Sequence, residues 1–302
     1  MTDNSKKRLV ERLVADLGDE TRCLLPLLGG LSAAEWAAAT PAKGWSVRDQ
    51  VTHLAFFDDA AALSLRDPVA FTRLRAEQVA LGAGFPDTIA EEHRQLSGAE
   101  CLAWLSRSRD AVLAGYRAAD PGARLPWYGP DMGVASSVTA RLMETWAHGQ
   151  DVRDALGVAA VVTPRLHHVA DLGIRTFGFS FLQRGLPVPG EPVFVELAGP
   201  GGESWTWGPA GAGNRVTGAA LDFCLVVTQR RNVADTGLRV TGPVADQWIA
   251  IAQAFAGRPT DPRPPGQFAT GVGQFATGVE QSATGVEQFA KSPGQPAKGT
   301  RA

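Results

Sequence analysis

The sequence predicts an α-helical four-helix bundle followed by a small α+β domain. Three observations carry this prediction. Apolar residues recur with helical period up to about position 185, shorter apolar runs separated by Gly and Pro follow, and a short repeat begins near position 266. We therefore expect a helix bundle over residues 1–186, an α+β domain over 187–257 and a disordered tail over 258–302.

Apolar stripes and capping residues mark the first helices of the bundle. Residues 7–28 carry apolar side chains at i, i+3 and i+4 spacing. Ser46, with Asp49 three residues later, is a good N-cap for a helix that continues through Ala61. A further helical pattern covers residues 98–117.

The last long helix of the bundle is expected over residues 136–156. Either Ser136 or Ser137 would cap its beginning, and Gly157 would end it in a left-handed conformation. Pro164, which a first turn tolerates, would then begin another helix that reaches Phe177.

The α+β domain is predicted from short alternating runs. Two strands would form a hairpin around a Gly-rich turn, and a helix, a short strand and a last amphipathic helix would follow. These elements are expected at residues 192–197, 205–207, 219–229, 238–241 and 245–255.

The C-terminal tail repeats a seven-residue unit: GQFATGV is followed by another GQFATGV, then EQSATGV and EQFAKSP. Such a period is compatible with a coiled coil, but each unit offers few apolar residues. Glycine in almost every unit and proline in the last ones disfavour a helix. We interpret the repeat as a disordered tail in preference to a binding element.

Composition bounds the class of protein. The chain has 302 residues, 44% of them hydrophobic and 20% charged, as is typical of a soluble globular protein. A net charge of −2 gives no electrostatic reason to expect nucleic acid, and no apolar run has the length of a membrane span. Three widely spaced cysteines and the lack of a signal-peptide pattern favour a reducing cytoplasm. We expect a monomer or homodimer.

Two helices carry a candidate metal site. Glu144 and His148 are four residues apart, so a helix places both on one face, and His53 lies in the middle of another predicted helix. Two imidazoles and a carboxylate, with a position left for water, are typical of catalytic zinc. The spacing alone also fits a solvated i, i+4 contact for Glu144 and His148, and a core position for His53.

The motifs around these residues resemble a known family. The segment 44–54, GWSVRDQVTHL, is similar to the second-helix motif of DinB-like proteins, and more narrowly to that of the actinobacterial mycothiol-dependent maleylpyruvate isomerases. Glu144, His148 and Asp151 resemble the E-x-x-x-H-x-x-D signature of the same family, and the resemblance continues to about residue 257.

The resemblance implies a DinB-like bundle, a sterol-carrier-like C-terminal domain, and Zn²⁺ or another divalent metal held by His53, Glu144 and His148. It also implies mycothiol or a similar low-molecular-weight thiol as cosubstrate. A metal-bound thiol ionises at neutral pH. The thiolate would attack a small electrophile; loss of the thiol after bond rotation gives isomerisation, and its retention gives transfer. The protein's own cysteines need not be the nucleophile.

Three further residues are candidates for the chemistry. Asp151, one turn beyond His148, would orient a ligand imidazole or approach the metal, or else would pair with Arg153 or Arg48. Arg230 and Arg231 end a predicted helix, where they would complement its carbonyl groups. The isomerase branch places a C-terminal-domain arginine near its active site, so either arginine is alternatively an anion clamp for a carboxylate-bearing substrate.

Two other functions compete with the thiol enzyme. The protein would be non-catalytic if it only bound metal and its C-terminal domain held an apolar ligand. It would be a zinc hydrolase if metal-bound water were the nucleophile, although the sequence contains neither an H-E-x-x-H motif nor a nucleophile elbow.

Overall fold

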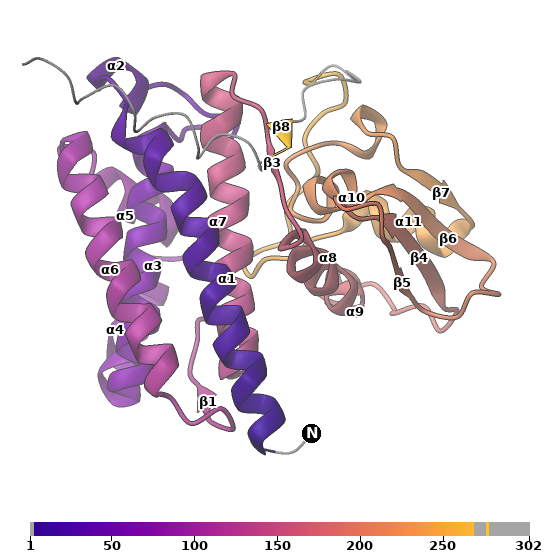
Figure 1. The fold of residues 1–302 in the computed structure, drawn as a ribbon, viewed down its shortest axis with the longest axis horizontal. Coiled ribbons are helices and arrows are strands. Elements are labelled where there is room, and N and C mark those ends of the chain that lie inside the picture. The colour runs from indigo at the N-terminus through magenta and orange to yellow at the C-terminus, as the bar shows by residue number, and fades with distance from the viewer. Residues whose placement is uncertain (1–2, 269–275, 278–302) are drawn as a thin grey trace, which may run out of the picture.

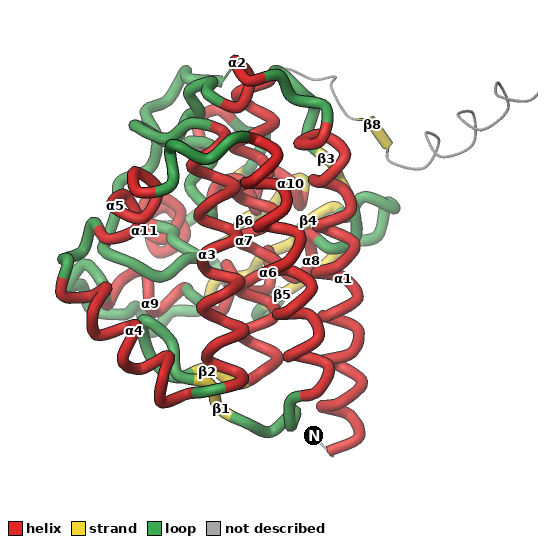
Figure 2. Tube along the Cα trace, turned by 90° about the vertical axis from the view of Figure 1, so that its left-hand side faces the viewer, coloured by secondary structure: helices red, strands yellow, loops and turns green. Residues whose placement is uncertain are grey.

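The computed structural model describes residues 3–268 and 276–277. Four long helices lie side by side as a bundle (Figure 1), and the view turned by 90° shows them running along one common direction (Figure 2). The predicted bundle is thus observed. Its helices are α1 (Asp3–Gly29), α3 (Val47–Arg66), α6 (Gly98–Ala118) and α7 (Val134–Leu156), with the short α2 (Ala33–Trp36) between α1 and α3.

Capping residues begin these helices largely where the sequence predicts. Ser46 accepts a hydrogen bond from the backbone N–H of Asp49, and the Asp49 carboxylate accepts one from the N–H of Ser46, so both members of a capping box are in place. Gly157 ends α7 at φ 64°, a left-handed conformation that glycine adopts without strain.

The predicted cap of α7 is wrong by a few residues. The helix begins at Val134 after an extended Gly133, not after Ser136 or Ser137. Ser137 lies inside the helix and is buried, where its hydroxyl group forms a hydrogen bond of 2.7 Å with Tyr116 on α6. The short strands β1 (Arg124–Leu125) and β2 (Met132–Gly133) pair and bring the chain to this starting point.

Two helices that we did not predict pack on α3. They are α4 (Pro68–Ala80), which Asp67 caps, and α5 (Phe85–Glu92). Helix α4 buries only Phe71 and Gln78, so its sequence has no apolar stripe from which a helix could be predicted. Both helices pack on α3 and cover the side chains next to the candidate site.

The second part of the chain folds as a four-stranded sheet with helices. Three of the strands and the two helices lie near their predicted positions, whereas the strand β6 (Asn214–Ala219) was not predicted. The strand order is β5-β4-β6-β7; β4 and β6 are parallel, and the two outer strands are antiparallel to their neighbours. The finer assignment to a sterol-carrier-like fold stays a prediction. The elements are β4 (Val193–Ala198), β5 (Ser204–Trp207), β6 (Asn214–Ala219), α10 (Ala220–Val227), η1 (Val233–Asp235), β7 (Arg239–Thr241) and α11 (Pro243–Ile251).

The two parts share one hydrophobic core. The single helix predicted from Pro164 to Phe177 is divided at Thr176 into α8 (Leu166–Arg175) and α9 (Phe177–Leu182). Helix α8 packs on α7 on one side and on α10 on the other. Buried side chains therefore continue from the bundle into the sheet-bearing part without a gap.

The beginning of the predicted tail contacts the rest of the protein. Arg263 donates to Asp151 at 2.5 Å, and the hydroxyl of Thr260 donates to Gln229 at 2.6 Å. Residues 276–277 form β8 (Ala276–Thr277), which pairs in parallel with β3 (Val161–Val162). Most of the repeat lies outside the described residues, so the domain boundaries and the disorder of the tail stay predictions. None of the described helices has the length and apolar character needed to cross a membrane.

Candidate metal centre

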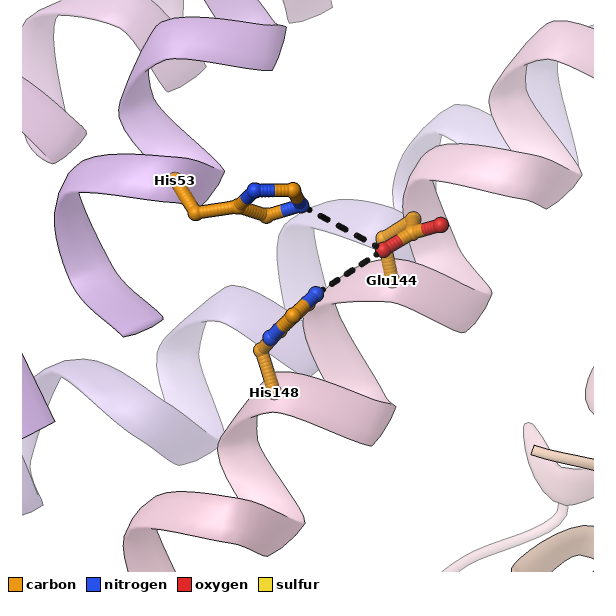
Figure 3. Close-up of side chains that lie close together, drawn as sticks. All are labelled: His53, Glu144 and His148. Carbon is orange, nitrogen blue, oxygen red and sulfur yellow. Dashed lines mark hydrogen bonds and ion pairs between the residues drawn. The ribbon is translucent and has the colours of Figure 1, made fainter. Parts of the chain in front are cut away.

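His53, Glu144 and His148 meet between α3 and α7 (Figure 3). One carboxylate oxygen of Glu144 lies 3.0 Å from Nε2 of His148 and 3.7 Å from Nε2 of His53. One ligand atom from each residue lies within 4.8 Å of those of the other two. The structure thus brings together the three residues that the sequence singles out.

Local structure explains the convergence. Glu144 and His148 are one turn apart on α7, which presents both side chains toward α3. His53 lies in the second turn of α3, whose first turn is fixed by the capping box at Ser46. Because α3 and α7 pack directly on each other, the three side chains reach a common point while being only 10–22% exposed.

The protonation states at this point are those of metal ligands. Burial, reinforced by the neighbouring His148, lowers the pKa of His53 to about 4, so the imidazole is neutral at neutral pH. Burial alone would raise the pKa of Glu144, but hydrogen bonds and charge interactions with both histidines outweigh it and hold that pKa well below its usual range. An ionised carboxylate therefore faces a neutral imidazole.

The donor set fits a divalent metal such as zinc. Two imidazole nitrogens and a carboxylate oxygen are ligands that Zn²⁺ accepts, and three protein ligands are typical of catalytic zinc sites. Among the described residues, no fourth His, Cys, Asp or Glu joins this group. The arrangement leaves room for an exogenous ligand, and occupation by a metal stays a prediction.

Aromatic side chains surround the three ligands. The ring of Trp45 stacks on His148 with centroids 6.0 Å apart, and Phe57 lies against His53 with centroids 4.5 Å apart. The indole N–H of Trp45 donates to Asp87 on α5 at 2.7 Å. Tyr128 contacts Phe57 from the loop before α7. Trp45 thus lies beside the candidate site.

Asp151 pairs with neither Arg153 nor Arg48. Its buried carboxylate accepts hydrogen bonds from Arg230 at 2.8 and 3.1 Å and from Arg263. Burial would raise the pKa of Asp151, but the charges of these arginines lower it instead. The group that contacts the ligand imidazole of His148 is Gln50, not Asp151.

The two candidate arginines hold the end of α10 against the ligand helix. Arg230 donates to the carbonyl of Thr228 at 2.7 Å, so it complements the end of that helix, and it also pairs with Asp151. Arg231 makes two hydrogen bonds of 2.7 Å to Asp154. Both guanidinium groups are mostly buried and already paired with carboxylates on α7. Their catalytic role stays a prediction.

A second charged cluster lies deeper in the bundle. Asp58, which follows His53 on α3, is fully buried and accepts from Arg109 of α6 at 2.7 Å and from Arg141 of α7 at 2.9 Å. Arg109 also donates to Thr145 at 2.9 Å. This cluster, which we call the Asp58 cluster, was not predicted because its members lie on three different helices.

The remaining histidines and cysteines do not join the centre. His168 pairs with Asp16 at 2.8 Å, and Nδ1 of His93 donates a hydrogen bond to the carbonyl of Ile89. Burial raises the pKa of the Cys101 thiol to about 11, and it raises that of Cys224 as well. Neither thiol is ionised at neutral pH, and both side chains are buried.

Comparison with known proteins identifies the family. Residues 17–153 match the model of the mycothiol maleylpyruvate isomerase N-terminal domain. An uncharacterised protein of Mycobacterium tuberculosis, found in strains H37Rv and CDC 1551, is 45% identical over 246 residues, which is 82% of this chain and 96% of the relative. This chain belongs to the DinB-like, mycothiol-dependent maleylpyruvate isomerase family. All three candidate ligands lie within the residues that match the isomerase domain.

The comparisons extend beyond that domain. Two crystal structures, of a mycothiol-dependent maleylpyruvate isomerase and of a histidine-to-alanine mutant of it, are 13% identical to this chain. They align with TM-scores of 0.49 and 0.48 over 76% of this chain and 90% of theirs. Residues 189–239 match a family model described as wyosine base formation. The strands β4, β5 and β6 and the helix α10 lie within that segment.

Proposed function

We propose that this protein is a metal-dependent thiol enzyme, an isomerase or S-transferase that uses mycothiol or a similar low-molecular-weight thiol on a small electrophile. The observation that carries the proposal is the cluster of His53, Glu144 and His148 in a chain of the maleylpyruvate isomerase family. Zn²⁺ or another divalent ion held there would supply Lewis acidity and favour the ionised form of a bound thiol.

The protein's own residues would prepare the site for such a thiol. Glu144 contributes one negative charge, and the two imidazoles contribute none when neutral, so a divalent ion would keep a net positive charge that attracts a thiolate. The low exposure of the three side chains limits competing water and strengthens this attraction. Trp45 and Phe57 would exclude water from the same side.

The proposal includes Arg230 or Arg231 as an anion clamp for a carboxylate-bearing substrate, with Asp151 as the residue that holds Arg230 next to the ligand helix. Arg230 is the better placed of the two arginines, because its partner Asp151 follows His148 by one turn of α7. A substrate carboxylate would have to replace Asp151 as the partner of Arg230, at least in part. Arg231 is held by Asp154 and lies under the ring of Phe268, which makes it less accessible.

One observation favours the alternative of a small-ligand-binding protein. A surface groove of about 360 Å³ lies between η1, β7 and α11, lined by Val233, Leu238, Val240 and Ile249 among others. It belongs wholly to the C-terminal part. An apolar ligand bound there would not require the metal centre, so the two functions are separable by substitution.

Metal analysis followed by cobalt spectroscopy tests the proposal. The wild-type protein should bind about one divalent ion per chain, and His53→Ala should lose most of it. In the Co²⁺-loaded protein, addition of mycothiol should produce a sulfur-to-cobalt charge-transfer band in the near ultraviolet. Glu92→Ala, a substitution of an exposed acidic residue on α5, is the control and should bind metal like the wild type.

Two results would contradict the proposal. Retention of zinc by His53→Ala would show that the ion binds elsewhere. Metal binding without a thiol-dependent band would remove the thiolate from the centre and favour hydrolysis or a non-catalytic role. Isomerisation and transfer are then distinguished by whether labelled sulfur leaves with the product.

A further inference from the structure

Gln50 lies behind the ligand His148 on the side opposite the carboxylate. It belongs to α3, three residues before His53, and is fully buried. Its side-chain oxygen lies 2.5 Å from Nδ1 of His148, while Nε2 of the same imidazole faces Glu144 at 3.0 Å. Each ring nitrogen of His148 therefore faces a side-chain oxygen atom.

The direction of the hydrogen bond between Gln50 and His148 follows from the contacts of Thr40. The hydroxyl of Thr40 lies 2.8 Å from the carbonyl oxygen of Trp45, which only accepts, so the hydroxyl proton is used there. The Thr40 oxygen must then accept from the side-chain nitrogen of Gln50, at 2.8 Å. The Gln50 amide is thereby oriented with its oxygen toward His148.

The orientation of the amide fixes the tautomer of His148. An amide oxygen accepts only, so Nδ1 of His148 must carry the proton. A neutral imidazole has a single N–H, which leaves a lone pair on Nε2, the atom that faces Glu144. A lone pair opposite a carboxylate oxygen is unfavourable until a cation lies between them, so this arrangement is suited to a metal ligand.

The start of this chain of contacts is rigid backbone. The N–H of Thr40 donates to the same carbonyl of Trp45 at 2.8 Å, and residues 39 and 46 form an antiparallel bridge. The loop that presents this carbonyl also carries the Trp45 ring, which is stacked on His148 at an interplanar angle of 17°. One loop therefore sets both the hydrogen bond and the ring packing of the ligand.

We propose that Gln50 is a positioning residue that holds His148 in its Nδ1–H tautomer and in the orientation that a metal ligand requires, with Thr40 keeping the Gln50 amide from turning round. This inference rests on the proposed metal centre. Partners of this kind typically change metal affinity 10- to 100-fold when removed. Neither Gln50 nor Thr40 contacts the metal or the substrate directly.

Two substitutions of Gln50 separate positioning from packing. Gln50→Met keeps the length and the burial but removes the acceptor, and should weaken zinc binding about 10- to 100-fold in competition with a chromogenic chelator. Gln50→Glu keeps an acceptor for Nδ1–H and should stay within about 3-fold of the wild type. Thr40→Val frees the amide to turn round and should give an intermediate loss.

The control is a glutamine of equal burial in the C-terminal part. Gln253 is 1% exposed and bonds through its side chain to backbone atoms of Phe255, Arg258 and Thr260. Gln253→Met should lower the unfolding midpoint without changing zinc affinity. A loss of affinity in Gln253→Met as large as in Gln50→Met would show a general effect of destabilisation and overturn the inference.

The tautomer is measured directly in the chelator-treated protein, which separates this inference from the metal proposal. With ¹⁵N-labelled histidine, at a pH high enough for the imidazole to be neutral, the wild type should show His148 as the Nδ1–H tautomer, and Gln50→Met should show a mixture. If wild-type His148 is a mixture or the Nε2–H form, the inference fails even when zinc binds. If the tautomer is fixed but the wild type binds no metal, the proposed function fails and the role of Gln50 in metal binding fails with it. If Gln50→Met does not fold, Thr40→Val decides, and unchanged tautomer and affinity there overturn the inference.

Discussion

Two carboxylates of the bundle, Asp58 and Glu144, each lie at the centre of a cluster, and the two clusters differ in what their carboxylate requires. Asp58 lies between Arg109 and Arg141, whose guanidinium groups always carry their protons and donate to both of its oxygens. Glu144 lies between His53 and His148, and its carboxylate faces Nε2 of both imidazoles; a neutral imidazole carries a single proton, which the contact with Gln50 places on Nδ1 of His148. The Asp58 cluster is complete as it stands, whereas the Glu144 cluster needs a cation.

This difference separates a structural cluster from a functional one. Every polar atom of Asp58 has a donor, and Arg109 also reaches Thr21 of α1 and Thr145 of α7, so the cluster joins all four long helices. The Glu144 cluster joins only α3 and α7, and it is open to an exogenous ligand. Burial and charge alone would not distinguish the two; the protonation of the partners does.

The largest expected effect comes from replacing the carboxylate of each cluster by an amide. In chelator-treated protein at about pH 8, Asp58→Asn should lower the free energy of unfolding by about 3–5 kcal/mol, because two guanidinium groups then lie buried without their counter-charge. Glu144→Gln should change it by less than about 1 kcal/mol, since the new amide N–H can donate to Nε2 of a neutral His148. Urea unfolding monitored by tryptophan fluorescence measures both.

Metal binding should change in the opposite order. Glu144→Gln should lose most of its zinc affinity, and Asp58→Asn should keep it at temperatures where it remains folded. Equal losses of stability for both variants in the absence of metal would mean that Glu144 is as structural as Asp58, and the distinction between the clusters would be lost.

Sequence alone predicts one of these clusters and not the other, for a physical reason. Glu144 and His148 share a helix face at fixed spacing, and the family motif adds His53. Asp58, Arg109 and Arg141 have no local pattern that connects them, because each comes from a different helix. Gln50 is intermediate: it precedes His53 by three residues on one face, yet its partner His148 lies 98 residues away.

The same distinction applies to the fold. Helices that bury an apolar stripe and begin with a capping box, such as α3 and α6, are predicted at their first residue, although α3 continues five residues beyond Ala61. Helix α4 buries only two side chains, so its sequence lacks the apolar periodicity that predicts a helix. The contacts of Arg263 with Asp151 depend on a segment that composition marks as a tail, so only the structure reveals them.

An intermediate effect concerns pH and His53. In the folded, metal-free protein burial lowers the pKa of His53 to about 4, whereas the unfolded chain takes up the proton near pH 6.5. As the pH falls below about 6.5, the unfolded state binds this proton and the folded state does not, so stability decreases toward low pH. Between about pH 7.5 and pH 5 the loss attributable to His53 should be about 2 kcal/mol.

The measurement compares wild type with His53→Gln, both treated with chelator, by urea unfolding at the two pH values. The variant should lose about 2 kcal/mol less than the wild type over this range. Glu144 contributes little to the pH dependence in this range. Its pKa is lowered in the folded state, so the stability that it provides is lost only below about pH 4.5. Identical pH profiles would show that His53 is not held neutral by burial.

The smallest effect tests whether the two clusters are independent, although both lie along α7. Thr145 is adjacent to Glu144 in sequence, but its hydroxyl accepts from Arg109 at 2.9 Å and so belongs to the Asp58 cluster. Thr145→Val leaves one guanidinium N–H without an acceptor and should cost about 1–2 kcal/mol of unfolding free energy. Zinc affinity should stay unchanged, because the neighbouring Glu144 side chain points to α3 on another face of the helix.

Thr139→Val provides the matched control on the same helix. The Thr139 hydroxyl is also largely buried, but it donates only to the backbone carbonyl of Ala135. Its removal leaves no charged donor without an acceptor, so it should cost less than about 0.5 kcal/mol of unfolding free energy. A loss of zinc affinity in Thr145→Val but not in Thr139→Val would reveal coupling between the clusters through Arg141. That residue donates to Asp58 at 2.9 Å and precedes Glu144 by one turn. The Asp58 cluster and the Glu144 cluster would then belong to a single charged network.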